Sequence, residues 1–243
     1  MSTKQHARFA GVLYLIVAIF GGFAHLLVRA HVYVPGDASA TTQSVMANAG
    51  LVRFGVVADL LSTTVFLFLG MALYLLLKHV NTNAARAMVI LVAIATTIIS
   101  LNLVFQFAAQ LVATDGSYVA AFGPAGANAL VLLLLDIQHY GYLIAQIFFG
   151  LWLVPLGYLA YRSRMFPKAL GVLLIVGGVS YVVDMLGLFL IPEFGETISA
   201  FVVIPPAVAE LWMVGYLLVK GVRVERQGAP SPAAVRGHAV TSA

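Results

Sequence analysis

Apolar residues fill nearly the whole chain in six long runs, separated by short segments rich in turn-forming or charged residues. A helix needs about 20 mostly apolar residues to cross the hydrocarbon layer of a membrane, and every run reaches that length. The pattern therefore predicts an all-α, polytopic integral membrane protein built as a bundle of six transmembrane helices. We place these helices at about residues 9–29, 54–77, 86–113, 129–161, 168–191 and 197–219.

Glycine and proline mark several of the breaks between runs. Gly123-Pro124 separates the third run from the fourth. Pro205-Pro206 falls inside the sixth run and predicts a kink or a delayed start, because proline removes a backbone donor and clashes with the preceding turn. The longest loop, residues 30–53, follows the first run. Asp37 or Ser39 can cap a short surface helix in this loop.

Lys and Arg residues are distributed unevenly between the two sides of the predicted bundle. The richer side carries Lys4, Arg8, Lys78, Arg86, Arg162, Arg164, Lys168, Lys220, Arg223, Arg226 and Arg236. The other side carries only Arg29 and Arg53. Cytoplasmic loops of membrane proteins have an excess of these residues, so both termini are predicted to be cytoplasmic. Residues 1–226 then form one transmembrane domain, and residues 227–243 form a disordered cytoplasmic tail.

Composition narrows the class of protein further. The chain is 62% hydrophobic and 9% charged, whereas soluble domains are about 25% charged. It has no cysteine, which excludes disulfides, thiolate zinc sites and iron–sulfur clusters. The basic residues are spread over short loops instead of forming one basic face, so no nucleic-acid partner is predicted. Membrane lipids are the expected partners, and the oligomeric state stays open.

Charged and polar residues inside the apolar runs are the main indication of function. An ionised side chain at the bilayer centre costs about 2.5–3.5 kcal/mol, so such residues should face protein, water or a ligand. At about 1.5 Å per residue, most of them lie in the outer third of the membrane, with Glu210 deeper. This predicts an outward-facing polar cavity above Glu210. The candidates for binding a ligand or proton are Asp136, His139, Asp59, Asp184, Glu210, Asn102, Gln106, His25, Arg29 and Arg53.

Two faces of the predicted helices are distinctive. One face of the fourth helix carries, at spacings of three and four, Asp136, His139, Leu143, Gln146, Gly150, Leu153 and Gly157. Glycines at its inner end predict close approach of a neighbouring helix, because small residues let backbones approach in lipid. One face of the third helix carries Asn102, Gln106 and Gln110. These amides are more typical of interhelical hydrogen bonds than of ligand binding.

Asp136 and His139 lie three residues apart, on one helix face, and such a pair can bind a divalent metal. His25, with Asp59 or Asp184, would complete a mixed metal site if the helices bring them together. The alternative is an Asp–His hydrogen bond that fixes helix packing. No other cofactor is predicted, and no catalytic residue is assigned.

The sequence around the fourth and fifth runs also resembles a known family. Asp136-x-x-His139-x-Gly141-Tyr142 leads into Ile147-Phe-Phe-Gly150 and then Pro155-Leu-Gly157-Tyr158. Together with Pro35-Gly36-Asp37-Ala38 in the long loop, this pattern resembles the bacterial membrane family called domain of unknown function 4386. The resemblance covers roughly residues 6–220. It implies a six-helix protein of the bacterial inner membrane and implies no activity.

Three functions are compatible with these features. The leading hypothesis is a non-enzymatic membrane protein whose polar cavity binds or moves a small polar solute, ion or proton. The second is an intramembrane hydrolase, in which a metal activates water against a lipid-like substrate. The third is a non-catalytic membrane subunit or sensor, in which the polar network only sets helix packing. Two of the three are not enzymes, and we favour a non-enzymatic role.

Overall fold

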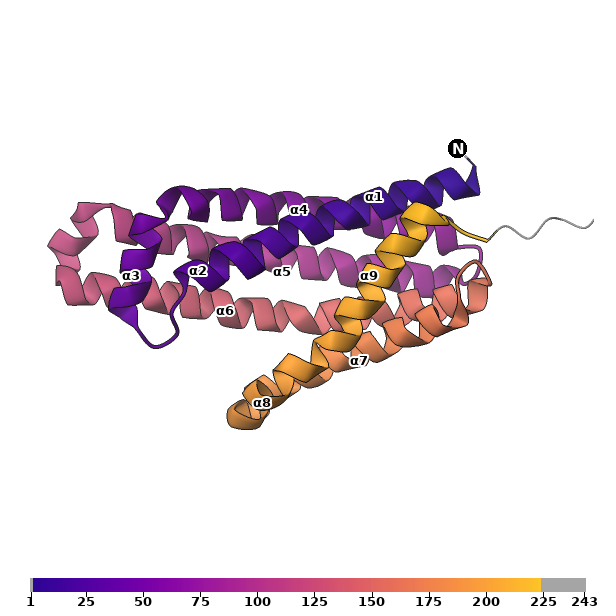
Figure 1. Cartoon of the computed structure of the whole chain (residues 1–243). Helices are drawn as coiled ribbons and strands as arrows, with labels where there is room; N and C mark the ends of the chain where they lie inside the picture. The colour runs from indigo at the N-terminus through magenta and orange to yellow at the C-terminus, as the bar shows by residue number, and fades with distance from the viewer. Residues whose placement is uncertain (1, 224–243) are drawn as a thin grey trace, which may run out of the picture.

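The computed structural model describes residues 2–223, and all regular structure in that range is helical (Figure 1). The elements are α1 (Thr3–Gly22), η1 (Phe23–Arg29), α2 (Ala30–Val32), α3 (Ala38–Ala47), α4 (Ala49–Leu77), α5 (Thr82–Thr114), α6 (Gly116–Ser163), α7 (Lys168–Leu190), α8 (Pro192–Val202) and α9 (Ile204–Val219). Within the described part, six spans are long and apolar enough to cross a membrane. The predicted all-α, six-helix fold is confirmed. The tail predicted at residues 227–243 lies outside the described residues.

Capping residues determine where several helices begin. Asn81 accepts the Ala84 N–H through its side chain at 3.0 Å, so α5 starts four residues before its apolar run. Asp37 accepts the Ala40 N–H at 2.9 Å and caps α3, which confirms the predicted surface helix. A side-chain oxygen at this position satisfies one of the free N–H groups of the first turn. Helix α5 is therefore longer than the hydrophobic run that predicts it.

Three of the spans are interrupted. Gly123 breaks α6 with a left-handed φ of 71°, a conformation that glycine adopts without a steric penalty. The last span is divided into α8 and α9, and Pro205-Pro206 lies in the first turn of α9, as the delayed start predicts. The first span contains η1, a π-helical segment of seven residues that the hydrophobic pattern did not predict. A π-helix carries an extra residue per turn and often occurs at functional sites.

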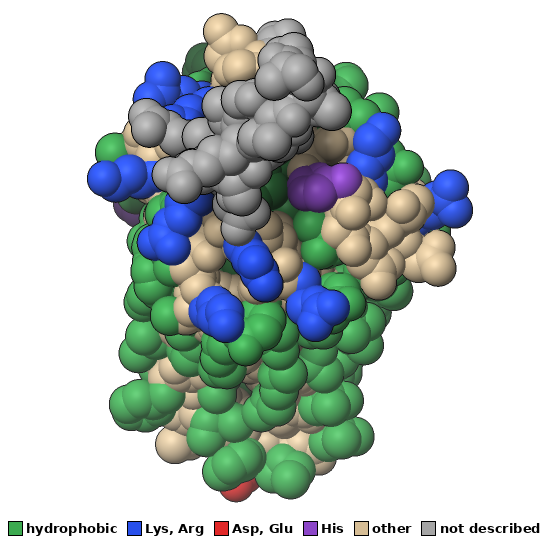
Figure 2. Space-filling view, turned by 90° about the vertical axis from the view of Figure 1, so that its right-hand side faces the viewer, with side chains coloured by type: hydrophobic (Ala, Val, Ile, Leu, Met, Phe, Trp, Pro, Cys, Tyr) green, Lys and Arg blue, Asp and Glu red, His purple; other side chains and the backbone are tan. Residues whose placement is uncertain are grey.

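Helices α1, α4, α5 and α6 run side by side, α7 packs on α6, and α9 crosses between α7 and α1 (Figure 1). The N-terminus, the α4–α5 turn, the α6–α7 turn and the end of α9 meet at one end of the bundle, at the right of Figure 1. We call this the basic end, because the described Lys and Arg residues other than Arg29 and Arg53 gather there (Figure 2). The turn between α5 and α6 and the helix α3 lie at the opposite end.

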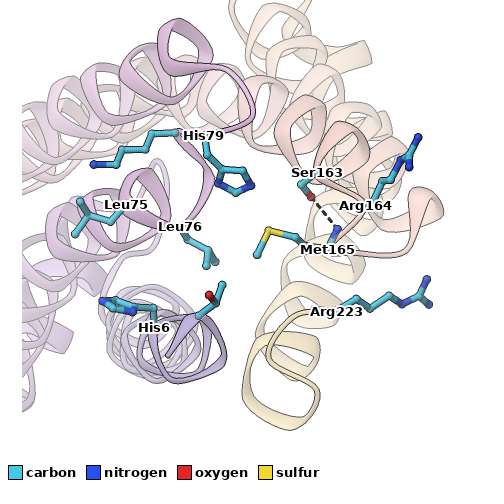
Figure 3. A pocket seen from close by; sticks show the side chains of 10 residues that line it. His6, Leu75, Leu76, His79, Ser163, Arg164, Met165 and Arg223 are labelled. Atoms are coloured by element: carbon cyan, nitrogen blue, oxygen red, sulfur yellow. Dashed lines mark hydrogen bonds between the residues drawn. The ribbon is translucent and has the colours of Figure 1, made fainter. Parts of the chain in front are cut away.

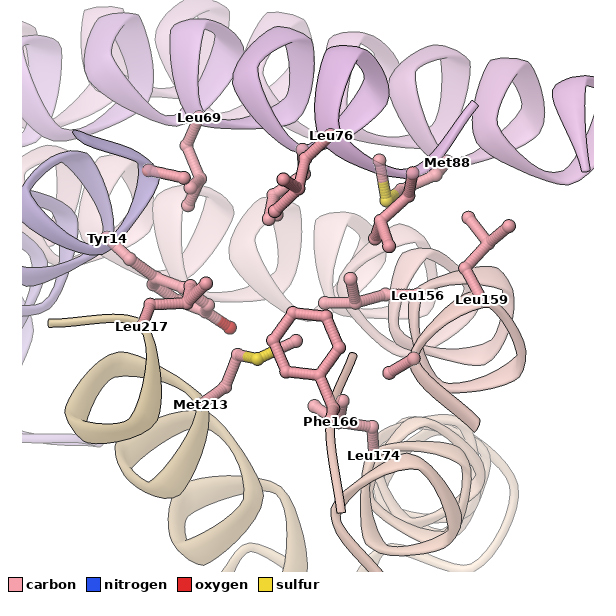
Figure 4. Packing of buried hydrophobic residues seen from close by; sticks show 14 of the residues in the cluster. Tyr14, Leu69, Leu76, Met88, Leu156, Leu159, Phe166, Leu174, Met213 and Leu217 are labelled. Atoms are coloured by element: carbon pink, nitrogen blue, oxygen red, sulfur yellow. The ribbon is translucent and has the colours of Figure 1, made fainter. Parts of the chain in front are cut away.

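Two apolar clusters fill the bundle. The larger cluster lies toward the basic end, and all six spans contribute to it (Figure 4). Its largest fully buried side chains include Trp152, Tyr14 and Phe166. The smaller cluster lies under α3 and contains Val32, Val45, Val52, Val112, Val131 and Leu135, among others. Buried polar side chains separate the two clusters.

Close backbone contacts join α6 to α7. A Cβ atom added to Gly150 would lie 2.5 Å from the carbonyl oxygen of Gly178. One added to Gly157 would lie 2.6 Å from the carbonyl oxygen of Gly171. Only glycine allows this approach, and the predicted close packing at the inner end of the fourth span is confirmed.

Candidate functional site

A layer of buried polar side chains crosses the bundle between the two apolar clusters. We call it the polar layer, and it contains Asp59, Ser62, Thr63, Thr96, Asn102, Gln106, Gln138, Gln146 and Asp184. Four spans contribute residues. On α4, α5 and α6 these residues lie between the parts of the helix that enter the two apolar clusters, whereas α7, which carries Asp184, enters only the larger cluster. Polar groups placed inside a hydrophobic bundle are costly unless they are paired, so their partners show what the layer does.

A contact between the His25 imidazole and the Asp59 carboxyl group joins η1 to α4 at the polar layer. His25 Nε2 lies 3.3 Å from Asp59 Oδ1, and the Asp59 side chain is only 5% exposed. His25 belongs to the π-helical segment, and its ring lies 4.2 Å, centroid to centroid, from the ring of Tyr142 on α6. Three spans thus meet at one imidazole.

The His25–Asp59 pair lies in the wall of a cavity of about 260 Å³. Ser62 and Thr63 add hydroxyl groups to this wall, and Phe66 and Phe149 add aromatic rings. Ser62 Oγ donates to a carbonyl of α1, and Thr63 Oγ1 to carbonyls of its own helix. In contrast, His25 Nδ1 and Asp59 Oδ2 have no hydrogen-bond partner among residues 2–223. One donor or acceptor on each side chain is therefore available to a ligand.

Asp136 and His139 pair with the end of the first span, and not with each other. The hydroxyl of Tyr33 donates to Asp136 Oδ1 at 2.5 Å, and Arg29 contacts His139 Nδ1. The Arg29 guanidinium also lies over the Tyr33 ring, 5.4 Å from its centroid. Burial, and next the hydrogen bond to Asp136, raise the pKa of Tyr33 above its ordinary value. Tyr33 is therefore a neutral hydrogen-bond donor at physiological pH.

This pairing changes the interpretation of the Asp136 and His139 candidates. Neither residue lines the cavity at His25, and His25 pairs with Asp59 instead of joining them. Within the described chain, no group of three or more His, Asp or Glu side chains is placed to hold a metal ion. The arginine beside His139 also makes this position electrostatically unfavourable for a cation.

Glu210 and Asp184 occupy two further sites. Glu210, on α9, accepts hydrogen bonds from Tyr14 at 2.8 Å and from Tyr181 at 3.3 Å. Tyr14 belongs to the larger apolar cluster, so Glu210 lies deeper than the polar layer, as its position in the chain predicts. Asp184 accepts a hydrogen bond of 2.5 Å from Gln146 through Oδ2.

The amides of α5 serve mainly to join helices. Asn102 donates to the backbone carbonyl of Gln138 on α6 at 2.6 Å, and Gln110 donates to that of Ala49 on α4 at 2.9 Å. Gln106 is buried in the polar layer. Arg53 is exposed at the start of α4, away from the cavity. The interhelical role predicted for these amides is confirmed for Asn102 and Gln110.

Sequence reasoning missed the tyrosines. Tyr14 and Tyr181 bind Glu210, Tyr33 binds Asp136, and Tyr142 stacks on His25. In an apolar run, a tyrosine is usually an ordinary core or interface residue. A useful signal was present, because a buried carboxylate needs hydrogen-bond donors and phenol groups are the most compatible donors in an apolar run.

The fold and the polar layer define a multi-pass membrane protein with six helical spans and an intramembrane His–Asp pair. The chain belongs to the family described as Domain of unknown function (DUF4386), whose model matches residues 9–221. The resemblance noted in the sequence is thereby confirmed. No curated protein and no solved structure matches the chain.

Proposed function

We propose that this protein binds a small polar solute, ion or proton in its intramembrane cavity, at the His25–Asp59 pair. One observation carries the proposal. A carboxyl group and an imidazole contact each other at 3.3 Å in the wall of a cavity inside an apolar bundle, and each keeps one atom without a partner in the described chain. Intramembrane ionisable residues are rare, and they commonly mark substrate, ion or proton pathways.

The size and lining of the cavity suit a small ligand. Ligand pockets of about 300–1,000 Å³ are typical for drug-sized molecules, and this one measures about 260 Å³. Its lining combines His25, Asp59 and two hydroxyl groups with the aromatic rings of Phe66 and Phe149. A proton, an ion or a compact amphipathic solute fits this combination better than a lipid chain does.

The π-helical segment supports movement at this position. A π-turn widens the helix at His25 and departs from the α-helical hydrogen-bond pattern that surrounds it. The segment can shift between π and α without unfolding the rest of the span. Such a shift would rotate His25 relative to Asp59, and it would connect ligand binding to helix movement.

The distribution of charge supports an orientation for the cavity. Positively charged residues gather at the end of the bundle that carries the N-terminus (Figure 2). Because cytoplasmic sides carry an excess of Lys and Arg, this distribution supports a topology with both termini in the cytoplasm, in a bacterial inner membrane. His25 lies more than twenty residues along the first span from that end, so the cavity belongs to the outer half of the membrane.

Proton movement can be measured directly in proteoliposomes that contain a pH-sensitive dye. We expect an imposed proton gradient to dissipate faster with wild-type protein than with Asp59→Asn or His25→Gln. Asp115→Asn is the matched control, since it removes an exposed carboxylate outside the cavity. Native mass spectrometry of gently purified wild type tests the solute alternative, because a retained small molecule should be lost in the same two variants.

The two measurements together can contradict the proposal. If wild type neither moves protons nor retains a small molecule, the cavity has no ligand of the proposed class. If Asp59→Asn and His25→Gln behave like wild type in both assays but unfold at lower temperature, the pair is a structural contact. That second result would favour the membrane subunit or sensor, in which the polar layer only sets helix packing.

A further inference from the structure

Glu210 is a carboxyl group inside the bundle that does not line the cavity at His25. Its Oε2 atom accepts a hydrogen bond from Tyr14 of α1 at 2.8 Å. Its Oε1 atom accepts a hydrogen bond from Tyr181 of α7 at 3.3 Å. Two phenol groups from two different helices therefore hold this carboxyl group of α9 where three spans meet.

The surroundings of Glu210 do not neutralise a negative charge. In the part of the chain that the structure describes, no Lys, Arg or His pairs with Glu210. The titratable groups that face it are Tyr14 from α1, Tyr181 from α7 and Tyr142 from α6. The preceding residue, Ala209, belongs to the larger apolar cluster. An unpaired charge in such surroundings is costly, and uptake of a proton removes that cost.

Glu210 lies at the edge of an apolar barrier between two hollows. Phe66 lines the intramembrane cavity, whereas Leu76 and Met165 line a hollow of about 660 Å³ at the basic end (Figure 3). All three residues belong to the larger apolar cluster, which therefore separates the two spaces. Among the buried cluster residues of α1, Tyr14 lies farthest from the basic end, and it binds Glu210. Glu210 is thus on the cavity side of this barrier.

Tyr142 connects Glu210 with the cavity. It lines the cavity, and its ring lies 4.2 Å, centroid to centroid, from the ring of His25. It is also within electrostatic range of both Asp59 and Glu210. A phenol hydroxyl both accepts and donates a hydrogen bond, so it can accept a proton on one side and release its own on the other. Tyr142 then ends the exchange unchanged, as a proton relay between two carboxyl groups requires.

A second line of contacts joins the same two sites through aromatic rings. Phe66, in the cavity wall, lies 5.0 Å from the ring of Trp152 between centroids. Trp152 lies 5.9 Å from the ring of Tyr14, whose hydroxyl binds Glu210. These rings pack against one another without relaying a proton. A change in the contact between Tyr14 and Glu210 would therefore reach the cavity wall through packing.

We propose that Glu210 is a second proton-binding site, which receives its proton from the His25–Asp59 cavity through Tyr142. The proposal rests on the proposed function and narrows its ligand to the proton. Chains of Asp, Glu and His residues carry protons in membrane pumps and transporters. Protonation turns one oxygen of Glu210 into a donor, so the hydrogen bond at that oxygen rearranges. The contact of α9 with α1 or α7 changes with it.

Carbon NMR of full-length protein labelled at the glutamate carboxyl groups tests the site without any transport. The chain has only four glutamates, which are Glu193, Glu196, Glu210 and Glu225. The signal lost in Glu210→Gln should change from the protonated to the ionised form during a pH titration in nanodiscs. It should still be protonated where the exposed Glu193 has become ionised. A Glu210 signal that keeps one form at every pH overturns the proposal.

Proton movement in proteoliposomes tests the link to the cavity. Glu210→Gln and Tyr142→Phe should each slow the dissipation of an imposed proton gradient by about tenfold or more, since each removes one group of the relay. Glu193→Gln and Tyr140→Phe are the matched controls, because both residues are exposed and lie outside the cavity. Both controls should behave like wild type. In Tyr142→Phe the Glu210 signal should still titrate, which separates a relay from a structural role.

The outcomes separate this proposal from the proposed function. If Asp59→Asn stops proton movement and Glu210→Gln does not, the cavity remains the proton site and Glu210 lies outside the path. If wild type moves no protons, the proton path fails as a whole, even where the Glu210 signal titrates. Thermal unfolding shows whether each variant is folded. Tyr142→Phe keeps the aromatic ring, so it tests the path independently of any folding defect in Glu210→Gln.

Discussion

The two halves of α6 contact their neighbours in different ways. In the half farther from the basic end, which we call the outer half, side chains make the contacts, since Asp136 and His139 bind residues of the first span and the Asn102 side chain of α5 donates to the backbone carbonyl of Gln138. In the half nearer the basic end, which we call the inner half, Gly150 and Gly157 have no side chains, and the backbone of α6 meets the backbone of α7. One continuous helix therefore joins a polar, cavity-bearing region to a tightly packed one.

This difference indicates where stability and function reside. Lipid gives helices no hydrophobic reason to associate, so close packing and interhelical hydrogen bonds must hold the bundle. Interhelical hydrogen bonds contribute only about 0.6 kcal/mol each on average, whereas a dense contact is sensitive to a single added methyl group. We infer that the inner half carries most of the stability. The outer half is then free to keep a cavity and partly paired polar groups.

The largest expected effect comes from filling the glycine contact in the inner half. Gly150→Ala places a Cβ atom 2.5 Å from the Gly178 carbonyl oxygen, so the two helices must separate. We expect the free energy of unfolding to fall by about 2–3 kcal/mol, the range of overpacked cores. Equilibrium unfolding in mixed detergent micelles measures this change.

Gly215→Ala is the matched control for that substitution. Gly215 also lies inside a helix, but an added Cβ atom there meets nothing within 4 Å. The free energy of unfolding should stay within about 1 kcal/mol of wild type. Any change should be an increase, because alanine has a higher helix propensity than glycine. Equal effects of the two substitutions would show that the α6–α7 contact is not special, and the comparison of the two halves would fail.

A smaller effect is expected from the strongest polar contact between α5 and α6. Asn102→Ala removes the hydrogen bond to Gln138 and should lower the free energy of unfolding by about 1 kcal/mol. The neighbouring Leu101 is 67% exposed, and Leu101→Ala should change stability by no more than about 0.5 kcal/mol. A loss above about 3 kcal/mol for Asn102→Ala would place the main stabilisation in the polar half.

Much of this architecture could be predicted from the sequence, because hydrophobic length and turn chemistry are local properties. The six spans, the Asp37 cap and the effect of Pro205-Pro206 all follow from a few adjacent residues. The glycine contact was predicted from the face of one helix alone. Its partners Gly171 and Gly178 also repeat at seven residues, which matches the spacing of Gly150 and Gly157 in the facing helix.

Partner choice among the polar residues could not be predicted, because it depends on how helices rotate and tilt against one another. His25 could have paired with several carboxylates at similar depth, and the structure pairs it with Asp59. The π-helical segment contributes to this outcome, since it changes the direction in which His25 projects. Asp136 and His139 share a helix face, yet tyrosine and arginine from the first span separate their roles.

A still smaller effect is expected where the first span meets the outer half of α6. A double-mutant cycle with Tyr33→Phe and Asp136→Asn should give a coupling energy of about 0.5 kcal/mol, since Asp136 is only half-buried. Stability is again measured in mixed micelles. A coupling near 3 kcal/mol would mean that this contact locks the first span. The outer half would then be as rigid as the inner one.

The smallest effect should come from a charge that has only a local partner, at the end of the bundle opposite the basic end. Asp115 caps α6 and is exposed, and its carboxylate accepts the N–H of Ser117, which lowers the pKa of Asp115 from its ordinary value. A lowered pKa adds stability that is present above the unfolded value and is lost as the pH falls through the folded one. Asp115→Asn should therefore unfold slightly below wild type at pH 7, and the difference should shrink as the pH falls below the ordinary pKa of an Asp side chain. Thermal unfolding over that pH range checks this expectation, and a difference that does not shrink in acid would show that the amide disturbs the cap itself and not its charge.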